Sequence, residues 1–437
     1  MKNNKTTFSN YLVSGVAALA LTVGLASAAS AAENGKFRVG IVTFLSGPAA
    51  GPFGVPSANA AKILVEALNK GEVPAPYNKL GINGAEIEAV IIDEAGGATK
   101  QVEEYRNLVQ RQKVDAVIGY VSSGDCLAVA PVAEELKTFT IAYDCGTPRL
   151  FADNPDAQYM FRTGLDASVD NIGAVRYLKA TRPDVTRLSG IQQNYSWGQD
   201  SWADFTAAAA KLLPESEIVE EQFPKIYQGQ YGAEISALSV KRPEIVHSSF
   251  WGGDMEALVL QANARGLLED ATGLLTCGEA SLATYKDQEP NGMIIGARGP
   301  FGAFAPDNAL NTWFKGAYNA AYDLDPVYPA TKMAQAILGL KFAAENAGLA
   351  DKEIPTADQL ATGLKGATFE SVSGTVEMAR GNGHQAMQGI TYGEYHYEDG
   401  KASIVNTVSF SGECVTPPEG VSAADWIAQG FPGAQCN

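Results

Sequence analysis

The chain has 437 residues and a net charge of −17 at pH 7, and an acidic excess of this size repels DNA, RNA and anionic lipid. We therefore exclude nucleic acid as a partner and expect a protein that works in solution. The length suggests two or three domains.

The first 32 residues have the pattern of an export signal. Lys2 and Lys5 form a positive start, Tyr11 to Leu25 is mostly apolar, and two Ala-Ser-Ala triplets follow. We interpret residues 1–32 as a secretory signal peptide cleaved after one of its last two residues, with an uncleaved membrane anchor as the alternative. No cysteine near that site offers a lipid anchor, and no later apolar run reaches the roughly 18 residues that span a membrane. We therefore expect a soluble protein in the periplasm, with a charge that changes from −17 to −19 when the two lysines are lost.

Apolar runs in the first third of the chain predict β-strands, and helical patterns separate them. The run from Val114 to Val121 is apolar on both faces, which is typical of the middle of a parallel sheet. Gly71 is expected to end the first helix. The predicted strands are 37–44, 86–93, 114–121 and 139–143, and the predicted helices are 57–69, 99–112 and 127–136.

The same alternation repeats later in the chain, where predicted strands start about 30 residues apart, the size of one strand–helix–strand unit. We therefore expect an α/β fold of two doubly wound parallel-sheet lobes. Ligands bind such sheets beyond the carboxyl ends of the strands. The predicted strands are 185–192, 217–223, 244–250 and 274–277, the helices are 200–213, 232–241, 254–266, 331–345 and 356–364, and strand-like pieces fill 391–410.

Two loops at predicted strand ends carry small polar residues. Ser122 and Ser123 follow Val121, and if a helix starts near Asp125, their hydroxyls and its free N–H groups form an anion pocket. The alternative is that Ser123 or Asp125 only caps that helix. The next strand ends in Asp144-Cys145-Gly146-Thr147. This loop either presents N–H and hydroxyl groups to the same pocket or is an ordinary turn.

The five cysteines do not have the spacing of a zinc site, and only three histidines accompany them. We expect no metal and no cofactor. Export permits disulfides, and our preferred pairs are Cys126–Cys145 and Cys414–Cys436, with Cys277 unpaired. The first pair would join two loops that leave adjacent strands. Sequence alone does not fix this connectivity.

Several aromatic residues and one acid also follow predicted strand ends. Trp197 and Trp251 either face a ligand or pack against neighbouring loops. Phe53 lies in a Gly/Pro-rich loop that could project it into the crevice; this loop lacks the Gly-Lys-Ser/Thr ending of a phosphate loop, so we do not expect it to bind a nucleotide. Glu279 either pairs with a ligand ammonium group or is a solvated loop acid. The sequence contains no GxSxG, HExxH or Walker A motif, so we do not expect an enzyme.

Five segments together resemble one protein family. They are FRVGIVTFLSGP near the start, VDAVIGYVSSG, FRTGLD at 161–166, FWGGDMEA at 250–257 and LLTCGEA. The chain is similar to the periplasmic substrate-binding proteins of branched-chain or hydrophobic amino acid ABC transporters, the type I binding proteins. The resemblance covers nearly the whole chain after the signal peptide.

The resemblance implies a hinge of several strands between the two lobes. The implied lobes are 33–163 with about 303–390, and 164–302 with about 391–437. It also implies a monomer that closes on a small ligand and delivers it to an ABC permease in the inner membrane. A ligand sensor for a membrane receptor is the alternative, and the sequence does not separate the two.

The resemblance also assigns roles to residues at the strand ends. Ser122 and Ser123 match the family's site for a ligand carboxylate, and Glu279 matches its acid for the ligand amino group. Asp144 departs from the pattern, because an acid at that place would oppose a carboxylate. The lining positions match Phe53, Trp197, Trp251 and, less closely, Tyr328. We therefore expect an amino acid, or alternatively an aromatic carboxylate, amide or urea-type ligand, bound by Phe53, Val121, Ser122, Ser123, Asp144, Cys145, Gly146, Thr147, Trp197, Trp251, Glu279 and Tyr328.

Overall fold

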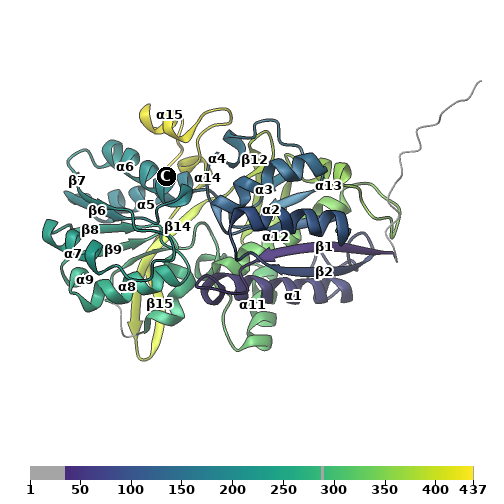
Figure 1. The fold of residues 1–437 in the computed structure, drawn as a ribbon, viewed down its shortest axis with the longest axis horizontal. Coiled ribbons are helices and arrows are strands. Elements are labelled where there is room, and N and C mark those ends of the chain that lie inside the picture. Colours follow the sequence, from purple (N-terminus) through teal and green to yellow (C-terminus); the bar gives the residue numbers. More distant parts are fainter. Residues whose placement is uncertain (1–34, 287–289, 437) are drawn as a thin grey trace, which may run out of the picture. The chain divides into compact units, whose positions relative to one another are not determined.

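The strands form two separate sheets, one on each side of the view in Figure 1. The computed structural model describes residues 35–286 and 290–436, so the expected signal peptide lies outside the described residues. Within them, the first sheet has the strand order β11-β12-β13-β5-β4-β3-β1-β2. Its strands are β1 (Lys36–Thr43), β2 (Glu86–Asp93), β3 (Ala116–Gly119), β4 (Thr140–Ala142), β5 (Met160–Arg162), β11 (Thr368–Ser371), β12 (Gly374–Arg380) and β13 (Gln385–Met387).

The second sheet has the order β15-β14-β10-β9-β8-β6-β7 within the described residues. In both sheets the strands that come first in the chain pair in parallel. Strands from the last quarter of the chain extend one edge: β13 joins β5 in parallel, and the other added pairs are antiparallel. The expected fold class is confirmed, although each sheet also has antiparallel strands at one edge. The strands are β6 (Arg187–Ile191), β7 (Glu217–Gln222), β8 (Ile245–Ser248), β9 (Thr272–Leu275), β10 (Ile294–Gly296), β14 (Ile390–Glu398) and β15 (Lys401–Phe410).

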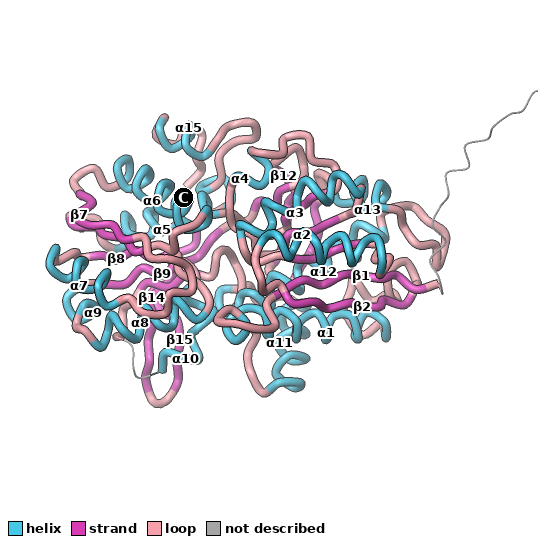
Figure 2. Tube along the Cα trace, in the orientation of Figure 1, coloured by secondary structure: helices cyan, strands magenta, loops and turns pink. Residues whose placement is uncertain are grey.

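Helices cover both faces of each sheet, as the cyan and magenta tubes in Figure 2 show. Strands β3 and β4 are buried along their whole length, which explains their continuous apolar sequence. The first lobe has α1 (Val55–Lys70), α2 (Ala98–Arg106), α3 (Ser123–Leu136), α4 (Arg149–Ala152), α11 (Ala309–Tyr322), α12 (Tyr328–Glu345) and α13 (Ala357–Leu364). The second has α5 (Ala167–Thr181), α6 (Ser196–Leu212), α7 (Gly232–Lys241), α8 (Gly253–Ala264), α9 (Leu267–Asp270), α10 (Leu282–Tyr285), α14 (Gly412–Val415) and α15 (Ala423–Ala428).

Most predicted elements are present, with shifts at their ends. Gly71 ends α1 with a φ of 69°, a left-handed conformation that glycine adopts without strain. The helix predicted for 127–136 begins earlier, at Ser123. The helix predicted for 99–112 is divided, because a π-helical turn over Asn107–Arg111 follows α2.

In the described residues the chain crosses between the sheets along 163–166, 297–308 and 388–389. The exact bounds of the two lobes stay a prediction. Both preferred disulfides are present: Cys126–Cys145 joins α3 to the loop after β4, and Cys414–Cys436 joins α14 to the last described residues. Cys277 is free and buried. None of the described helices is long and apolar enough to cross a membrane.

Candidate ligand-binding site

A cavity of about 10 Å³ lies where strands of both sheets end. A volume of this size holds about one water molecule, so a larger ligand enters only if the walls move apart. The lining comes from the loops after β1, β3 and β4 of the first sheet, the loops after β6, β8, β9 and β10 of the second, and the start of α12. It consists of Phe53, Val121, Ser123, Gly146, Tyr195, Trp197, Trp251, Cys277, Arg298 and Tyr328.

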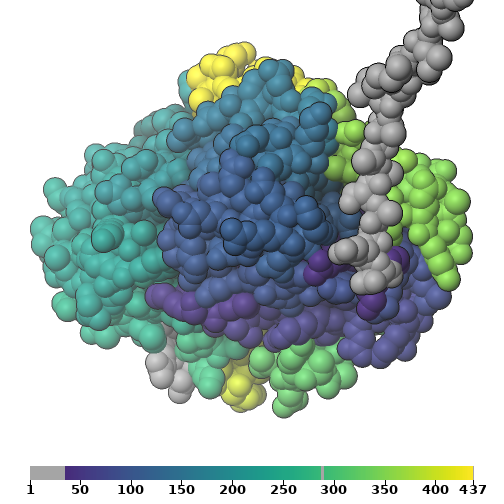
Figure 3. All heavy atoms as spheres, turned by 45° about the vertical axis from the view of Figure 1, so that its right-hand side comes forward, coloured from purple at the N-terminus to yellow at the C-terminus, as the bar shows by residue number. Residues whose placement is uncertain are grey.

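The two lobes touch beside this cavity. On the face drawn in Figure 3, the blue and purple surface meets the teal surface without an open groove between them. Gly253 N donates to Pro48 O at 2.9 Å, and the hydroxyl of Thr147 donates to Asp200 Oδ2 at 2.7 Å. Since Pro48 and Thr147 follow strands of the first sheet and Gly253 and Asp200 lie on helices of the second lobe, these bonds hold the lobes together.

Ser122 and Ser123 have different roles. The Oγ atom of Ser122 caps α3 by accepting a hydrogen bond from Asp125 N at 3.4 Å. The capping alternative named Ser123 or Asp125 and is therefore wrong about the residue. Ser123 lines the cavity, and its Oγ atom accepts a hydrogen bond from Thr147 N at 3.2 Å. Only one of the two expected hydroxyls thus belongs to the cavity wall.

A buried carboxylate that was not among the predicted site residues lies behind this loop. Glu94 follows β2, and its oxygens accept hydrogen bonds from Val121 N at 2.9 Å and Ser122 N at 2.8 Å. Burial, and then the nearby Asp125, raise the pKa of Glu94 well above its ordinary value. Glu94 therefore binds the N–H groups of Val121 and Ser122, which come just before the N–H groups of the helix that we expected to face an anion.

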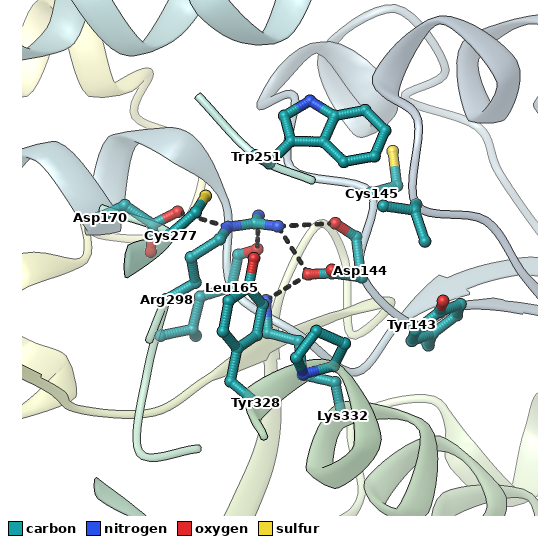
Figure 4. Close-up of polar contacts among 12 residues, drawn as sticks. Tyr143, Asp144, Cys145, Leu165, Asp170, Trp251, Cys277, Arg298, Tyr328 and Lys332 are labelled. Atoms are coloured by element: carbon teal, nitrogen blue, oxygen red, sulfur yellow. Dashed lines mark hydrogen bonds and ion pairs between the residues drawn. The ribbon is translucent and has the colours of Figure 1, made fainter. Parts of the chain in front are cut away.

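Arg298 is the centre of a buried group of charges (Figure 4). Its Nη1 atom donates to Asp144 O at 2.8 Å and to Asp144 Oδ1 at 2.6 Å. Its Nε atom donates to Asp170 Oδ2 at 3.0 Å, and its Nη2 atom donates to Leu165 O at 3.4 Å. The guanidinium carbon lies 4.3 Å from the ring centroid of Trp197, a distance typical of a cation–π contact.

Lys332 completes the group from α12. Its Nζ atom lies 2.7 Å from Asp144 Oδ1. Burial, followed by the charge of Arg298, lowers the pKa of Lys332 to about 8. Asp144 therefore neutralises the cations of the protein itself, which accounts for an acid at a position where the family resemblance implied none.

Glu279 is buried and does not line the cavity. Its Oε1 atom accepts a hydrogen bond from Ala303 N and its Oε2 atom accepts one from Tyr328 N, each at 2.7 Å. Burial raises the pKa of Glu279 to about 7, although both hydrogen bonds oppose this shift. The alternative of a solvated loop acid is wrong, and both carboxylate oxygens have backbone partners.

Comparisons with known proteins identify the family. A model of the family described as "Periplasmic binding protein" matches residues 36–401. The chain belongs to this family. Among curated relatives, the leucine-specific-binding protein of Salmonella typhimurium is 24% identical over 287 residues, covering 65% of this chain and 71% of the relative. The leucine-, isoleucine-, valine-, threonine- and alanine-binding protein of Pseudomonas aeruginosa is 25% identical over 370 residues, covering 82% and 89%.

Solved structures of similar proteins share the fold of this periplasmic binding protein. An ABC transporter solute-binding protein from Rhodopseudomonas palustris, in complex with 3,4-dihydroxybenzoic acid, has a TM-score of 0.74 at 20% identity and covers 86% of this chain and 98% of its own. The closed conformation of the leucine-, isoleucine-, valine-, threonine- and alanine-binding protein from Brucella ovis has a TM-score of 0.73 at 17% identity, covering 89% and 98%. At these identities the likeness establishes the fold alone.

The aromatic walls of this periplasmic binding protein hold one another in place. Phe53 contacts Trp251 and Tyr328 edge-on, with ring centroids 5.3 Å apart in both pairs. Trp251 Nε1 donates to the hydroxyl of Tyr195, and Trp197 Nε1 donates to Ser249 O, each at 2.7 Å. Such edge contacts and satisfied N–H groups are typical of well-packed aromatic residues.

The structure brings most of the predicted site residues of this periplasmic binding protein to one cavity. Tyr195, Cys277 and Arg298 line it without having been predicted. Of these, Tyr195 is in the same strand-end segment as the predicted Trp197, so the sequence could have indicated it. Nothing in the sequence around Arg298 indicated a site residue. Phe53, Val121, Ser123, Gly146, Trp197, Trp251 and Tyr328 line the cavity, and Ser122, Asp144, Cys145, Thr147 and Glu279 do not. Among the described residues no cluster of metal-ligating side chains is present.

Proposed function

We propose that this periplasmic binding protein is the ligand-binding component of an ABC importer. It closes around a small ligand by a hinge movement and delivers the ligand, as a monomer, to a permease in the inner membrane. The cavity carries this proposal, because its walls come from strand ends of both sheets. A movement along the crossing segments therefore opens or closes it.

Export is part of the proposal. Residues 1–32 act as a cleaved signal peptide, and the mature protein works in the periplasm. Membership of the periplasmic binding protein family supports this location, and the two disulfides are compatible with an oxidising compartment. The relatives bear the names of binding proteins and solute-binding proteins, which supports binding without catalysis.

Two classes of ligand agree with the known relatives. Curated relatives are named for leucine, or for leucine, isoleucine, valine, threonine and alanine, and a related structure holds isoleucine. Other related structures hold benzoate, 4-hydroxybenzoate or 3,4-dihydroxybenzoic acid. An aromatic-lined cavity accommodates either an apolar side chain or a ring.

The residues at the cavity have two roles in this proposal. Phe53, Val121, Ser123, Gly146, Trp197, Trp251 and Tyr328 contact the ligand. The other predicted residues position them: Ser122 caps α3, Cys145 fixes its loop to α3, Thr147 joins the lobes, Asp144 holds Arg298, and Glu279 binds the start of α12.

A thermal-shift screen of the purified protein tests the proposal. The panel contains amino acids, aromatic carboxylates, amides and polyamines. A ligand at a hundredfold excess over its Kd stabilises the folded state by about 2.7 kcal/mol, which raises the melting temperature of a cognate complex. Native mass spectrometry of protein that has never been unfolded looks for a co-purified ligand.

A pair of tryptophan variants locates the binding event. Trp251→Leu removes part of the cavity wall and is expected to reduce the ligand-induced shift. Trp313→Leu is the matched control, because Trp313 lies on α11 and does not line the cavity. If no compound stabilises the protein and none co-purifies, or if both variants reduce the shift equally, the proposed binding site is wrong.

A further inference from the structure

The charge inside the cavity distinguishes between the two ligand classes. Arg298 is the single charged side chain among the described residues that line it. Cys277 also lines it, and burial raises the pKa of its thiol to about 11, so the thiol is neutral. A zwitterionic amino acid would bring an ammonium group to a wall without a carboxylate, and burying such a charge unpaired is costly.

The acids near the cavity already have partners. Asp144 and Asp170 bind Arg298, and Asp144 also binds Lys332. Glu279 accepts two backbone N–H bonds, and Glu94 accepts those of the loop after β3. Asp144 Oδ2 and Asp170 Oδ1 have no hydrogen-bond partner among the described residues, but neither residue lines the cavity, so the cavity wall itself offers an ammonium group no carboxylate.

The cavity offers donors that need an acceptor. Arg298 has five N–H groups, four of which bind Asp144, Asp170 and Leu165. The remaining N–H, on Nη2, has no partner among the described residues. The hydroxyl of Tyr328 is also buried; it interacts with the thiol of Cys277, which is a weak acceptor, and makes no hydrogen bond of ordinary geometry in the described part of the chain. Both residues line the cavity, so an anionic acceptor placed there satisfies two buried donors.

The rest of the wall suits a flat apolar group. Phe53, Trp251 and Tyr328 meet edge-on, and Trp197 lies beneath the guanidinium of Arg298. An aromatic ring stacks on or against such faces with a preference that an aliphatic chain lacks. A carboxylate on that ring then points toward Arg298.

From these observations we infer that the ligand is a small aromatic carboxylate without an amino group, and that Arg298 and Tyr328 bind its carboxylate. This inference rests on the proposed function and names the ligand class of the same site. Arg298 supplies a charge-assisted hydrogen bond, which is stronger than a neutral one, and Tyr328 supplies a second donor.

Isothermal titration calorimetry with matched compounds tests the ligand class on the unmodified protein. Benzoate is compared with benzamide, which has the same shape and no charge. L-leucine is compared with 4-methylpentanoate and L-phenylalanine with 3-phenylpropanoate, and the members of each pair differ only in the ammonium group. We expect benzoate to bind at least about 100-fold more tightly than benzamide, as for loss of a buried charge partner, and each amine-free acid to bind more tightly than its amino acid.

Each other result overturns the inference. If the amino acids bind more tightly than their amine-free partners, the inference fails while the proposed function stands. Asp144, whose Oδ2 atom has no partner in the described chain, is then the acid to examine. If none of the six compounds binds, the inference also fails, and the broader thermal-shift panel decides the proposed function separately.

Tyr328→Phe tests the second donor with little risk to folding, because the hydroxyl that it removes interacts only with the weakly accepting thiol of Cys277 and makes no ordinary hydrogen bond among the described residues. We expect benzoate to bind roughly 10-fold more weakly, as for loss of a hydrogen bond to a charged group. Tyr120→Phe is the matched control: its hydroxyl is also buried and makes no hydrogen bond in the described chain, and Tyr120 does not line the cavity. Equal benzoate affinity in both variants would remove Tyr328 from the site.

Discussion

The Oε2 atom of Glu279 lies 2.7 Å from the backbone nitrogen of Tyr328, and this hydrogen bond joins the two lobes. Glu279 follows β9 of the second sheet, whereas Tyr328 is the first residue of α12, which packs on the first lobe. A carboxylate at the start of a helix interacts favourably with the free N–H groups there. Glu279 is therefore part of the contact that keeps the lobes closed.

Glu279→Gln is expected to lower the free energy of unfolding by about 1–3 kcal/mol, because one backbone N–H then faces an amide NH₂ group and loses its acceptor. Urea unfolding of the ligand-free protein measures this change. Glu103→Gln is the control, since Glu103 is exposed on α2. If Glu279→Gln leaves stability unchanged and weakens only ligand binding, Glu279 is the partner of a ligand ammonium group instead.

Stability is expected to fall as the pH rises, and Asp204 is one cause. Its Oδ2 atom accepts a hydrogen bond from the Ser168 hydroxyl at 2.7 Å. Burial raises the pKa of Asp204 to about 7; the Ser168 bond opposes this shift, and Asp166 and Asp200 add to it. The folded protein therefore binds the proton more tightly than the unfolded chain, so the contribution of Asp204 is present at low pH and lost as the pH rises toward 7.

Urea unfolding at pH 5, 6, 7 and 8 measures this contribution. One such group changes the free energy of unfolding by at most about 1.4 kcal/mol per pH unit. The asparagine of Asp204→Asn cannot titrate, so the free energy of unfolding of this variant is expected to fall less steeply as the pH rises. Part of the fall remains, because the pKa values of Glu279 and Asp125 are also raised, to about 7 and 6. A decline of the same slope in Asp204→Asn and the unmodified protein would show that Asp204 is not responsible.

The elements with a strong local pattern were predictable. The strand Glu86–Asp93 and the helix Gly232–Lys241 have the predicted bounds, because each has its own periodicity and flanking turn residues. Helix α5 was missed because most of its residues, polar ones included, are buried, which weakens the contrast between an apolar and a polar face. Strands β5 and β10 have three residues each, too few for a period to be visible.

The candidate site was predictable in its walls and not in its charges. Trp197 and Trp251 follow strand ends, so the rule for parallel sheets places them at the cavity. Arg298 gave no such signal, because its partners Asp144 and Asp170 lie 154 and 128 residues away in the chain. Only tertiary packing brings these residues together, and a single arginine in a loop forms no sequence motif by which the ion pairs could be recognised.

Removal of the Cys126–Cys145 disulfide is expected to affect both stability and binding. The cysteines are 19 residues apart, and a loop of this size contributes about 3 kcal/mol by restricting the unfolded chain. The bond also holds α3 against the loop that contains Thr147, whose N–H binds Ser123 at the cavity. We therefore expect the double variant Cys126→Ala/Cys145→Ala to lose stability in denaturant unfolding and to bind its ligand more weakly.

The second disulfide is the matched control for this prediction. Cys414 and Cys436 are 22 residues apart, so the same chain-entropy argument predicts a similar loss of stability. Neither residue lines the cavity. The double variant Cys414→Ala/Cys436→Ala is therefore expected to keep its ligand affinity. Equal losses of affinity in the two double variants would show that the first disulfide has no special role at the cavity.

Gly146→Ala is expected to disrupt the cavity, because Gly146 allows Arg298 and Trp197 to approach each other. A Cβ atom at position 146 would lie 2.3 Å from Arg298 Nη2 and 2.3 Å from Trp197 Cζ3. Neither side chain is free to move, since Arg298 binds Asp144 and the indole N–H of Trp197 binds Ser249 O. Overpacking of this kind costs about 1–3 kcal/mol of folding free energy.

Gly124→Ala on α3 is the control for Gly146→Ala, because the nearest atom to its added Cβ is Ser122 Oγ at 3.7 Å. Within a helix, replacing glycine by alanine is expected to stabilise the protein by up to about 1 kcal/mol. The two variants should thus change the free energy of unfolding in opposite directions, and only Gly146→Ala should weaken ligand binding, because it displaces Arg298. If Gly146→Ala unfolds and binds like Gly124→Ala, Arg298 and Trp197 do not need their close contact, and the geometry inferred for the ligand carboxylate is wrong.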